Sequence, residues 1–319
     1  YWTCNTISSI SESLGKHSLY QRRSIVGKKR SGGTLFNSAL LLALILMITG
    51  QKALAFDNSK IFFAGDSTGT CCYESINGGD LYQKSLFNRL RANPPAGMSI
   101  EPDRDIKSIL PCNPFKPNES GYGGLKIYDW ATECVDSSGN GVCNWSCDMT
   151  ELECCCTFRR GCIEQSDAQY VILALLNNDL NYLDTFYHGD VKLVIEAAKS
   201  LVMSLTRQGR TVIWISYSPI GYGNLGGGRV PCRNTSSCFF AINSNAEYFY
   251  QQFIPWIHDQ QGVYIIDFFN HIKEIYGSHV SQFSGFYQYD GVHLNPAGHQ
   301  LYYDFVYTKL QDILTAEKN

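Results

Sequence analysis

A serine that directly follows a predicted strand is the first residue of this 319-residue chain to suggest chemistry. Residues 63–69 read FAGDSTG, so an apolar run leads into Gly-Asp-Ser and small residues then open a helix. A serine at such a junction lies at the carboxyl edge of a parallel sheet, where N–H groups of the turn can hold a negative oxygen. Ser67 is therefore a candidate nucleophile, although Gly-Asp-Ser is also a common helix cap.

A histidine near the carboxyl end of the chain could act as the base for that serine. Residues 290–299 read DGVHLNPAGH, which places Asp290 three residues before His293 on one turn. Histidine can take the proton of a serine hydroxyl, while a carboxylate orients the ring and stabilises its charged form. Taken alone, Asp290 could instead form a turn and His293 could lie on the surface. His299 follows past Pro296 and is interpreted as structural.

Two further segments offer hydrogen-bond donors for an oxyanion. Asn177, Asn178 and Asp179 directly follow the apolar run 170–176. An asparagine amide at a strand end can donate to a developing negative oxygen. The glycine turn 121–124, of sequence GYGG, could supply a backbone N–H, because glycine lets the main chain come close to a ligand. Each segment could equally be a plain turn.

Taken together and in this order, the segments resemble the SGNH branch of the GDSL esterase/lipase family. The match runs from Lys60 to about Leu314, and its most specific pieces are FFAGDST and DGVHLNPAGH. The resemblance implies hydrolysis of ester bonds, with neither a cofactor nor a metal. It also implies a catalytic triad and an oxyanion hole: the triad is Ser67, Asp290 and His293, and the hole is formed by the Ser67 N–H, Gly124 and the Asn178 side chain.

The chain departs from the family pattern in two places. The third family block usually reads Gly-x-Asn-Asp, and Leu176 stands where that glycine belongs. The spacing to the following aspartate favours Asn178 over Asn177 as the residue that points inward. The second block is normally G-x-x-G, which the glycine turn meets loosely, and Gly124 is chosen over Gly123.

The elements that must position these residues alternate between strands and helices. Five short apolar runs predict strands, at residues 60–64, 125–128, 170–176, 211–216 and 263–268. In residues 191–208 apolar side chains recur every three or four positions, which predicts a helix that Gly209 ends, and residues 301–314 predict another. Such alternation predicts an α/β fold with a mostly parallel sheet covered on both faces. The family resemblance adds a three-layer α/β/α sandwich with about five strands in a flavodoxin-like order.

Residues 1–55 are expected to lie outside this domain, which spans 56–319. The apolar run 35–48 follows a basic stretch and precedes Ala-Leu-Ala, so residues 35–55 predict a secretory signal peptide cleaved after Ala55. An uncleaved anchor and a buried helix are the alternatives. The run is shorter than the roughly 20 residues that span a bilayer, so we expect no stable membrane insertion of the mature chain. Residues 1–34 predict an N-terminal extension.

The cysteine content indicates an oxidising compartment, and the charge argues against nucleic-acid partners. The chain has thirteen cysteines, a density typical of oxidising compartments, and seven of them lie in a predicted insert at about 132–167. This insert contains no histidine, which favours disulfides over zinc. Residues 1–55 hold seven of the 26 basic residues and one of the 29 acidic residues, so the remainder is acidic and nucleic-acid partners are not expected. Sequons are typical of a secreted glycoprotein and occur at Asn118, Asn144 and Asn234.

The sequence thus predicts a secreted serine esterase that acts on a small-molecule or polysaccharide ester. Carbohydrate O-acetyl esters are favoured by aromatic residues around the predicted site, which are Tyr122, Tyr128, Trp130, Tyr217, Tyr222, Phe286, Tyr287 and Tyr289. Lipase-like or acyltransferase activity would use the same residues on other substrates. The alternative from a different class is a secreted, disulfide-rich binding glycoprotein that keeps the fold without activity.

Overall fold

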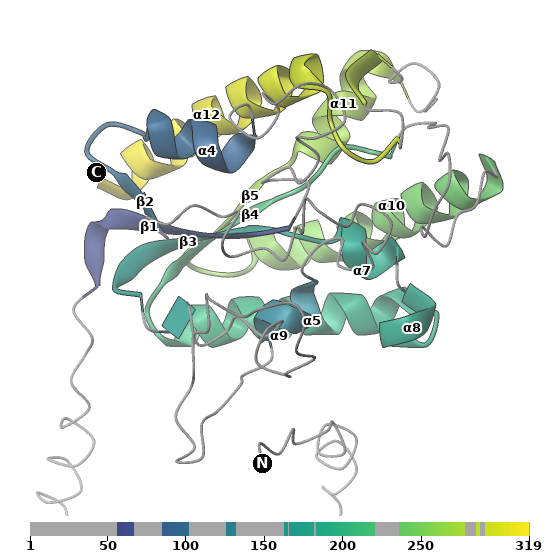
Figure 1. Cartoon of the computed structure of the whole chain (residues 1–319). Coiled ribbons are helices and arrows are strands. Elements are labelled where there is room, and N and C mark those ends of the chain that lie inside the picture. Colours follow the sequence, from purple (N-terminus) through teal and green to yellow (C-terminus); the bar gives the residue numbers. More distant parts are fainter. Residues whose placement is uncertain are drawn as a thin grey trace, which may run out of the picture. The chain divides into compact units, whose positions relative to one another are not determined.

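Five parallel strands form one sheet at the centre of the computed structural model, in the order β2-β1-β3-β4-β5 (Figure 1). Every neighbouring pair in this sheet is parallel. The order is the flavodoxin-like one, so the predicted parallel α/β sheet is confirmed. The strands are β1 (Asp57–Gly65), β2 (Ser99–Glu101), β3 (Ala168–Ala174), β4 (Thr211–Ile215) and β5 (Val263–Ile266).

The structure describes part of the chain, and several expectations fall outside that part. All the described residues belong to one compact unit, Phe56–Asn319. The predicted extension and the predicted signal peptide lie outside the described residues. The same holds for most of the cysteine-rich insert, the three sequons and every cysteine side chain. The described residues are 56–66, 85–101, 126–131, 163–164, 166–181, 183–220, 236–277, 285–287 and 291–318.

Helices cover both faces of the sheet and make three layers (Figure 1). One face carries α4 (Leu86–Ala92), α11 (Phe268–Tyr276) and α12 (Pro296–Lys318). The opposite face carries α5 (Ile127–Ala131), α9 (Val191–Arg207) and α10 (Ser236–His258). Two short helices follow β3, namely α7 (Asn177–Asn181) and α8 (Leu183–Tyr187). None of the helices in the described part combines the length and apolar character needed to cross a membrane.

The strands are apolar because both faces of the sheet are covered. All five residues of β4 are buried, and the fully buried Trp214 packs its ring 5.9 Å and 4.7 Å from the rings of Phe249 and Phe253 on α10. On the other face, the ring centres of Phe268 on α11 and Tyr302 on α12 lie 4.7 Å apart. Removal of this apolar surface from water is the main force that holds the layers together.

Helix α9 forms as the sequence predicts. Its buried residues follow the three-and-four spacing, and the side chain of Asp190 accepts a hydrogen bond from the Lys192 N–H to cap the amino end. Gly209 follows the helix with a φ of +89°, a conformation that glycine adopts without strain. The predicted helix and its glycine stop are both confirmed.

Two expectations about elements are corrected. The predicted strand at 125–128 is wrong, because residues from Ile127 onward form helix α5 and the second strand of the sheet is β2. A short apolar run fits a buried strand and a buried helix equally, and here the Asp179 carboxylate binds the Ile127 N–H that opens the helix. Helix α10 is absent from the expected elements, although its buried residues recur every three or four positions, at Ile242, Ala246, Phe249, Phe253 and Ile257.

Candidate active site

Buried polar side chains gather at the carboxyl ends of the strands. Strands β1 and β3 end side by side, with Gly65 paired to Ala174, so the residues that follow them meet at one edge of the sheet. A buried polar group is costly unless it is hydrogen-bonded, so a cluster of such groups indicates a built site. The buried polar residues that follow β1, β3 and β4 are Asp66, Asn177, Asn178, Asp179, Ser216 and Ser218.

A hydrogen bond joins the Gly-Asp-Ser segment to the asparagine segment. The Asn178 side-chain amide donates to the Asp66 carboxylate at 3.0 Å, across 112 residues of sequence. Both side chains are buried, with Asp66 fully inaccessible to solvent. Asp66 is the residue immediately before Ser67, which itself lies outside the described residues. The asparagine amide is therefore held against the residue that precedes the predicted nucleophile in sequence.

The two adjacent asparagines occupy different surroundings. Asn178 contacts Asp66, whereas the buried Asn177 side-chain nitrogen has no hydrogen-bond partner among the described residues. Of the two candidates that the sequence left, Asn178 is thus the one on the Gly-Asp-Ser side. Gly123 and Gly124 lie outside the described residues.

Leu176, just before helix α7, has a strained backbone. Its φ is +133°, in the region that favours glycine, and its side chain is buried with 1% exposed. Such conformations cost about 1–3 kcal/mol in non-glycine residues and cluster at functional sites. This is the position where the family resemblance expects glycine. The leucine therefore adopts the conformation that the missing glycine would adopt easily.

Asp179 is a buried carboxylate that sequence reasoning did not single out. Its two oxygens accept the Ile127 N–H at 3.0 Å and 3.1 Å, and the Tyr187 hydroxyl donates to one of them at 2.5 Å. Charge-assisted bonds of this kind offset the cost of burying the carboxylate. They tie the start of α5 to the residue beside Asn178. The signal in the sequence was the aspartate itself, directly after a strand and its two asparagines.

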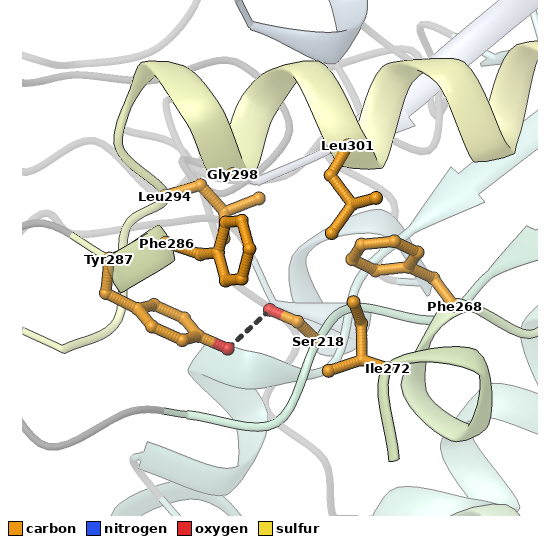
Figure 2. A pocket seen from close by; sticks show the side chains of 8 residues that line it. All are labelled: Ser218, Phe268, Ile272, Phe286, Tyr287, Leu294, Gly298 and Leu301. Carbon is orange, nitrogen blue, oxygen red and sulfur yellow. Dashed lines mark hydrogen bonds between the residues drawn. The ribbon is translucent and has the colours of Figure 1, made fainter. Parts of the chain in front are cut away.

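The segment that carries His293 is anchored to the end of β4. The Tyr217 hydroxyl donates to the Val292 carbonyl at 2.8 Å. The Tyr287 hydroxyl donates to the Pro219 carbonyl and is hydrogen-bonded to the Ser218 hydroxyl at 2.9 Å, the bond drawn in Figure 2. Tyr287 and Leu294 also form an isolated antiparallel bridge. His293, between Val292 and Leu294, is partly exposed. Asp290, its predicted partner, lies outside the described residues.

The second half of the DGVHLNPAGH motif has a structural explanation. The Asn295 side-chain oxygen accepts the N–H groups of Ala297 and Gly298 at 3.0 Å each, and so caps α12. Pro296 is the first residue of the helix, where proline is favoured. A Cβ on Gly298 would lie 2.3 Å from the Phe286 carbonyl oxygen, so only glycine fits there. Asn, Pro and Gly together fix the helix against the segment that precedes it.

His299 is buried and kept neutral. Its side chain is 1% exposed, and neither ring nitrogen has a hydrogen-bond partner among the described residues. Burial, with smaller contributions from the nearby charges of His293 and Arg89, lowers the pKa of His299 to about 3. A ring with so low a pKa is a poor general base near pH 7. Of the two histidines in the motif, His293 is the one suited to that role.

Tyr302 of α12 is buried beside Tyr217. Burial raises the pKa of its hydroxyl, and the nearby charge of Asp66 raises it further. The Tyr302 ring also packs edge-to-face on Tyr217 at 5.7 Å, and Tyr217 holds Val292. Tyr302 thus packs on the residue that binds the peptide leading into His293.

An apolar hollow lies beneath the His293 segment (Figure 2). Side chains from α11 and α12 face the Ser218–Tyr287 hydrogen bond across it, and Leu294 closes one side. It is lined by Ser218, Phe268, Ile272, Phe286, Tyr287, Leu294, Gly298 and Leu301. Within the part of the chain that the structure describes, no cluster of three or more His, Cys, Asp or Glu side chains could hold a metal ion.

The expected aromatic platform needs correction. Trp130, Tyr217 and Tyr287 are buried, with 3%, 4% and 6% of each residue exposed. These rings pack in the interior and, in Tyr217 and Tyr287, present hydroxyls to backbone carbonyls. They are therefore not available to stack on a sugar. Aromatic residues in short apolar runs serve a core as readily as a binding surface.

Comparison with known proteins gives structural matches only. No protein-family model matches the chain, and no curated protein is found to match its sequence. A carbohydrate acetylesterase family member from Sinorhizobium meliloti is 13% identical, with a TM-score of 0.46 over 81% of this chain and 99% of that one. The psychrotrophic esterase EstA from Pseudoalteromonas sp. is 14% identical, with a TM-score of 0.41 over 81% and 100%. A carbohydrate esterase family 3 structure from Talaromyces cellulolyticus is 15% identical, with a TM-score of 0.41 over 81% and 98%.

These likenesses, with low identity and TM-scores below 0.5, carry no argument about activity. Function therefore has to be inferred from the chain's own residues.

Proposed function

We propose that this protein is a secreted serine esterase of the SGNH type, which hydrolyses carboxylic esters through an acyl-enzyme intermediate. The observation that carries the proposal is the 3.0 Å hydrogen bond from Asn178 to Asp66. It brings the asparagine that the family motif requires next to the residue that precedes the serine nucleophile. Two short segments, each ambiguous in sequence, then become parts of one site.

In the proposed reaction, His293 takes the proton of the Ser67 hydroxyl while the serine oxygen attacks the ester carbonyl carbon. Asp290 orients the imidazole and stabilises its charged form. The carbonyl oxygen becomes an oxyanion, which the Ser67 and Gly124 N–H groups and the Asn178 amide bind. The ester C–O bond breaks and the alcohol leaves with the proton from His293. Water then attacks the acyl-enzyme, giving a carboxylic acid and free serine.

Asp66 has a defined part in this scheme. Its buried carboxylate accepts one N–H of the Asn178 amide, so the plane of that amide is fixed before substrate arrives. A preorganised donor stabilises an oxyanion without reorganising during the reaction. Removal of one such donor in other enzymes costs roughly 10²–10³ in rate.

The substrate we propose is a carbohydrate O-acetyl ester. With Trp130, Tyr217 and Tyr287 buried, the supporting residues are the other five aromatic residues named for the site segments, Tyr122, Tyr128, Tyr222, Phe286 and Tyr289. Aromatic rings offer flat apolar faces that suit a sugar ring. Secretion, supported by the basic stretch, apolar run and Ala-Leu-Ala pattern before Phe56, would give the enzyme access to extracellular polysaccharide.

The experiment that tests the proposal compares ester substrates with site variants. The chain is expressed through an oxidising secretory route and assayed on p-nitrophenyl acetate, butyrate and palmitate and on acetylated xylan. We expect the acetyl esters to react fastest. We also expect His293→Ala to lower kcat by roughly 10²–10⁴, because general-base help contributes about that much.

The matched control is His258→Ala, which removes an exposed histidine at the end of α10 and should keep kcat within about twofold. Wild-type activity in His293→Ala would contradict the assignment of the base. Faster turnover of palmitate than of acetate would contradict the proposed acyl group.

A further inference from the structure

We propose that Tyr217 is a positioning residue for His293: its hydroxyl fixes the peptide group that leads into the histidine. This inference rests on the proposed function, since it gives the reason why His293 is held in place for proton transfer. It concerns a residue outside the predicted triad and oxyanion hole.

The first observation is the hydrogen bond from the Tyr217 hydroxyl to the Val292 carbonyl, at 2.8 Å. The bonded carbonyl belongs to the peptide between Val292 and His293. A peptide group is planar, so holding its oxygen also fixes the nitrogen and Cα of the next residue. A bond to Val292 O therefore orients the backbone from which the His293 side chain projects.

The second observation is that Tyr217 is itself held rigidly. It lies two residues after β4, which is paired on both sides, with β3 and with β5. Its side chain is 4% exposed, and its ring packs edge-to-face on the Tyr302 ring at an angle of 86°. A single buried side chain, that of Tyr217, thus links the end of β4 to the peptide that leads into His293.

A second tyrosine holds the same segment but not the same peptide. The Tyr287 hydroxyl donates to the Pro219 carbonyl and is hydrogen-bonded to the Ser218 hydroxyl, and Tyr287 is 6% exposed. Tyr217 and Tyr287 thus each contribute one buried hydroxyl to the link between β4 and this segment (Figure 2 shows the Tyr287 link). Of these two tyrosine hydroxyls, that of Tyr217 binds the peptide that leads into His293. Tyr287→Phe is therefore a matched control for Tyr217→Phe.

The test measures kcat, KM, the pH profile and thermal unfolding of the full chain carrying either substitution, with p-nitrophenyl acetate as substrate. We expect Tyr217→Phe to lower kcat about 10- to 100-fold with KM within about twofold, because small misplacements of a reacting group cost rates of this order. The pH at which kcat/KM falls on the acidic side should also differ between Tyr217→Phe and the wild type. Tyr287→Phe, which also loosens this segment, should lower kcat clearly less than Tyr217→Phe and leave the pH profile unchanged, while both substitutions lower the melting temperature similarly.

A second measurement reads the same effect without substrate. Hydrogen exchange of the His293 and Leu294 amides should accelerate in Tyr217→Phe and stay at the wild-type rate in Tyr287→Phe. Equal losses of kcat in both variants, in step with their melting temperatures, would show a merely structural role and overturn the proposal. Unchanged kcat and unchanged exchange in Tyr217→Phe would overturn it as well. An inactive wild type with faster exchange in Tyr217→Phe alone would contradict the proposed esterase activity but support the positioning role.

Discussion

Leu176 combines a buried side chain with a backbone conformation that favours glycine, and substitution can separate these two effects. Both Leu176→Ala and Leu176→Gly remove a buried side chain, at a cost of about 2–5 kcal/mol. Elsewhere alanine is usually more stable than glycine, by about 0.5–1 kcal/mol. At a φ of +133° alanine keeps the strain and glycine does not, so we expect the glycine variant to be the more stable by about 1 kcal/mol. Urea denaturation of the two variants measures the difference, and a more stable alanine variant would contradict a strained Leu176.

His299 should make stability depend on pH. Burial lowers its pKa to about 3 in the folded protein, against an ordinary value near 6.5 in the unfolded chain. Between these values the unfolded state binds the extra proton, so this contribution is present above about pH 6.5 and is lost as the pH falls toward 3. We expect wild type to lose about 2 kcal/mol of unfolding free energy between pH 8 and pH 5 relative to His299→Leu.

Denaturation of both proteins at several pH values tests this expectation. Because the leucine variant shares every other titratable group, the difference between the two curves isolates His299. A difference that stays constant from pH 8 to pH 5 would show that His299 is not buried as a neutral ring.

At the scale of elements, Asp179 joins α5 to the start of α7, so its loss should uncouple two segments. Asp179→Ala leaves the buried Tyr187 hydroxyl and the Ile127 N–H without this acceptor. An unsatisfied buried group costs about 1–3 kcal/mol, so we expect a loss of about 2–4 kcal/mol in unfolding free energy. The control is Asp312→Ala on the exposed face of α12, which should change stability by less than about 0.5 kcal/mol. Equal stability of the two variants would contradict the anchoring role.

The periodic elements were predictable from sequence, and the ambiguous ones were not. Helix α9 has a long periodic pattern that fits a helix only, and the short apolar runs of β1, β3, β4 and β5 were identified as strands because they alternate with turns and helical segments. The run at 125–128 fits a strand and a helix alike, and a contact with Asp179, more than fifty residues away, decides for the helix. The three-residue β2 is too short to leave a pattern.

The candidate site was predictable where a residue acts through its own chemistry. His293 and Asn178 could be named because an imidazole and an amide at strand ends suggest catalysis. The anchoring roles of Tyr217 and Asp179 could not be predicted, because these roles depend on which distant backbone group each side chain binds. Gly298 was visible as part of a motif, but its close approach to the Phe286 carbonyl appears only in three dimensions.

At the scale of the whole molecule, the two edges of the sheet have different tasks. The candidate site lies at the carboxyl edge. Near the amino edge, Arg210 just before β4 binds the chain that enters β3, by donating to the carbonyls of Ile163, Ser166 and Ala168 at 3.0, 2.7 and 2.5 Å. Ile163 and Ser166 are among the last residues of the cysteine-rich insert. The described end of the insert is therefore tied to the amino edge of the sheet.

The central claim is that Ser67 is an activated nucleophile in this site, and covalent labelling tests it most directly. A fluorophosphonate probe transfers its phosphonyl group to an activated serine oxygen and releases fluoride, and mass spectrometry then locates the adduct. We predict one adduct, on the peptide that contains Ser67, absent from Ser67→Ala and strongly reduced in His293→Ala. A folded wild-type protein that stays unlabelled, or that carries the adduct on another serine, would contradict the claim.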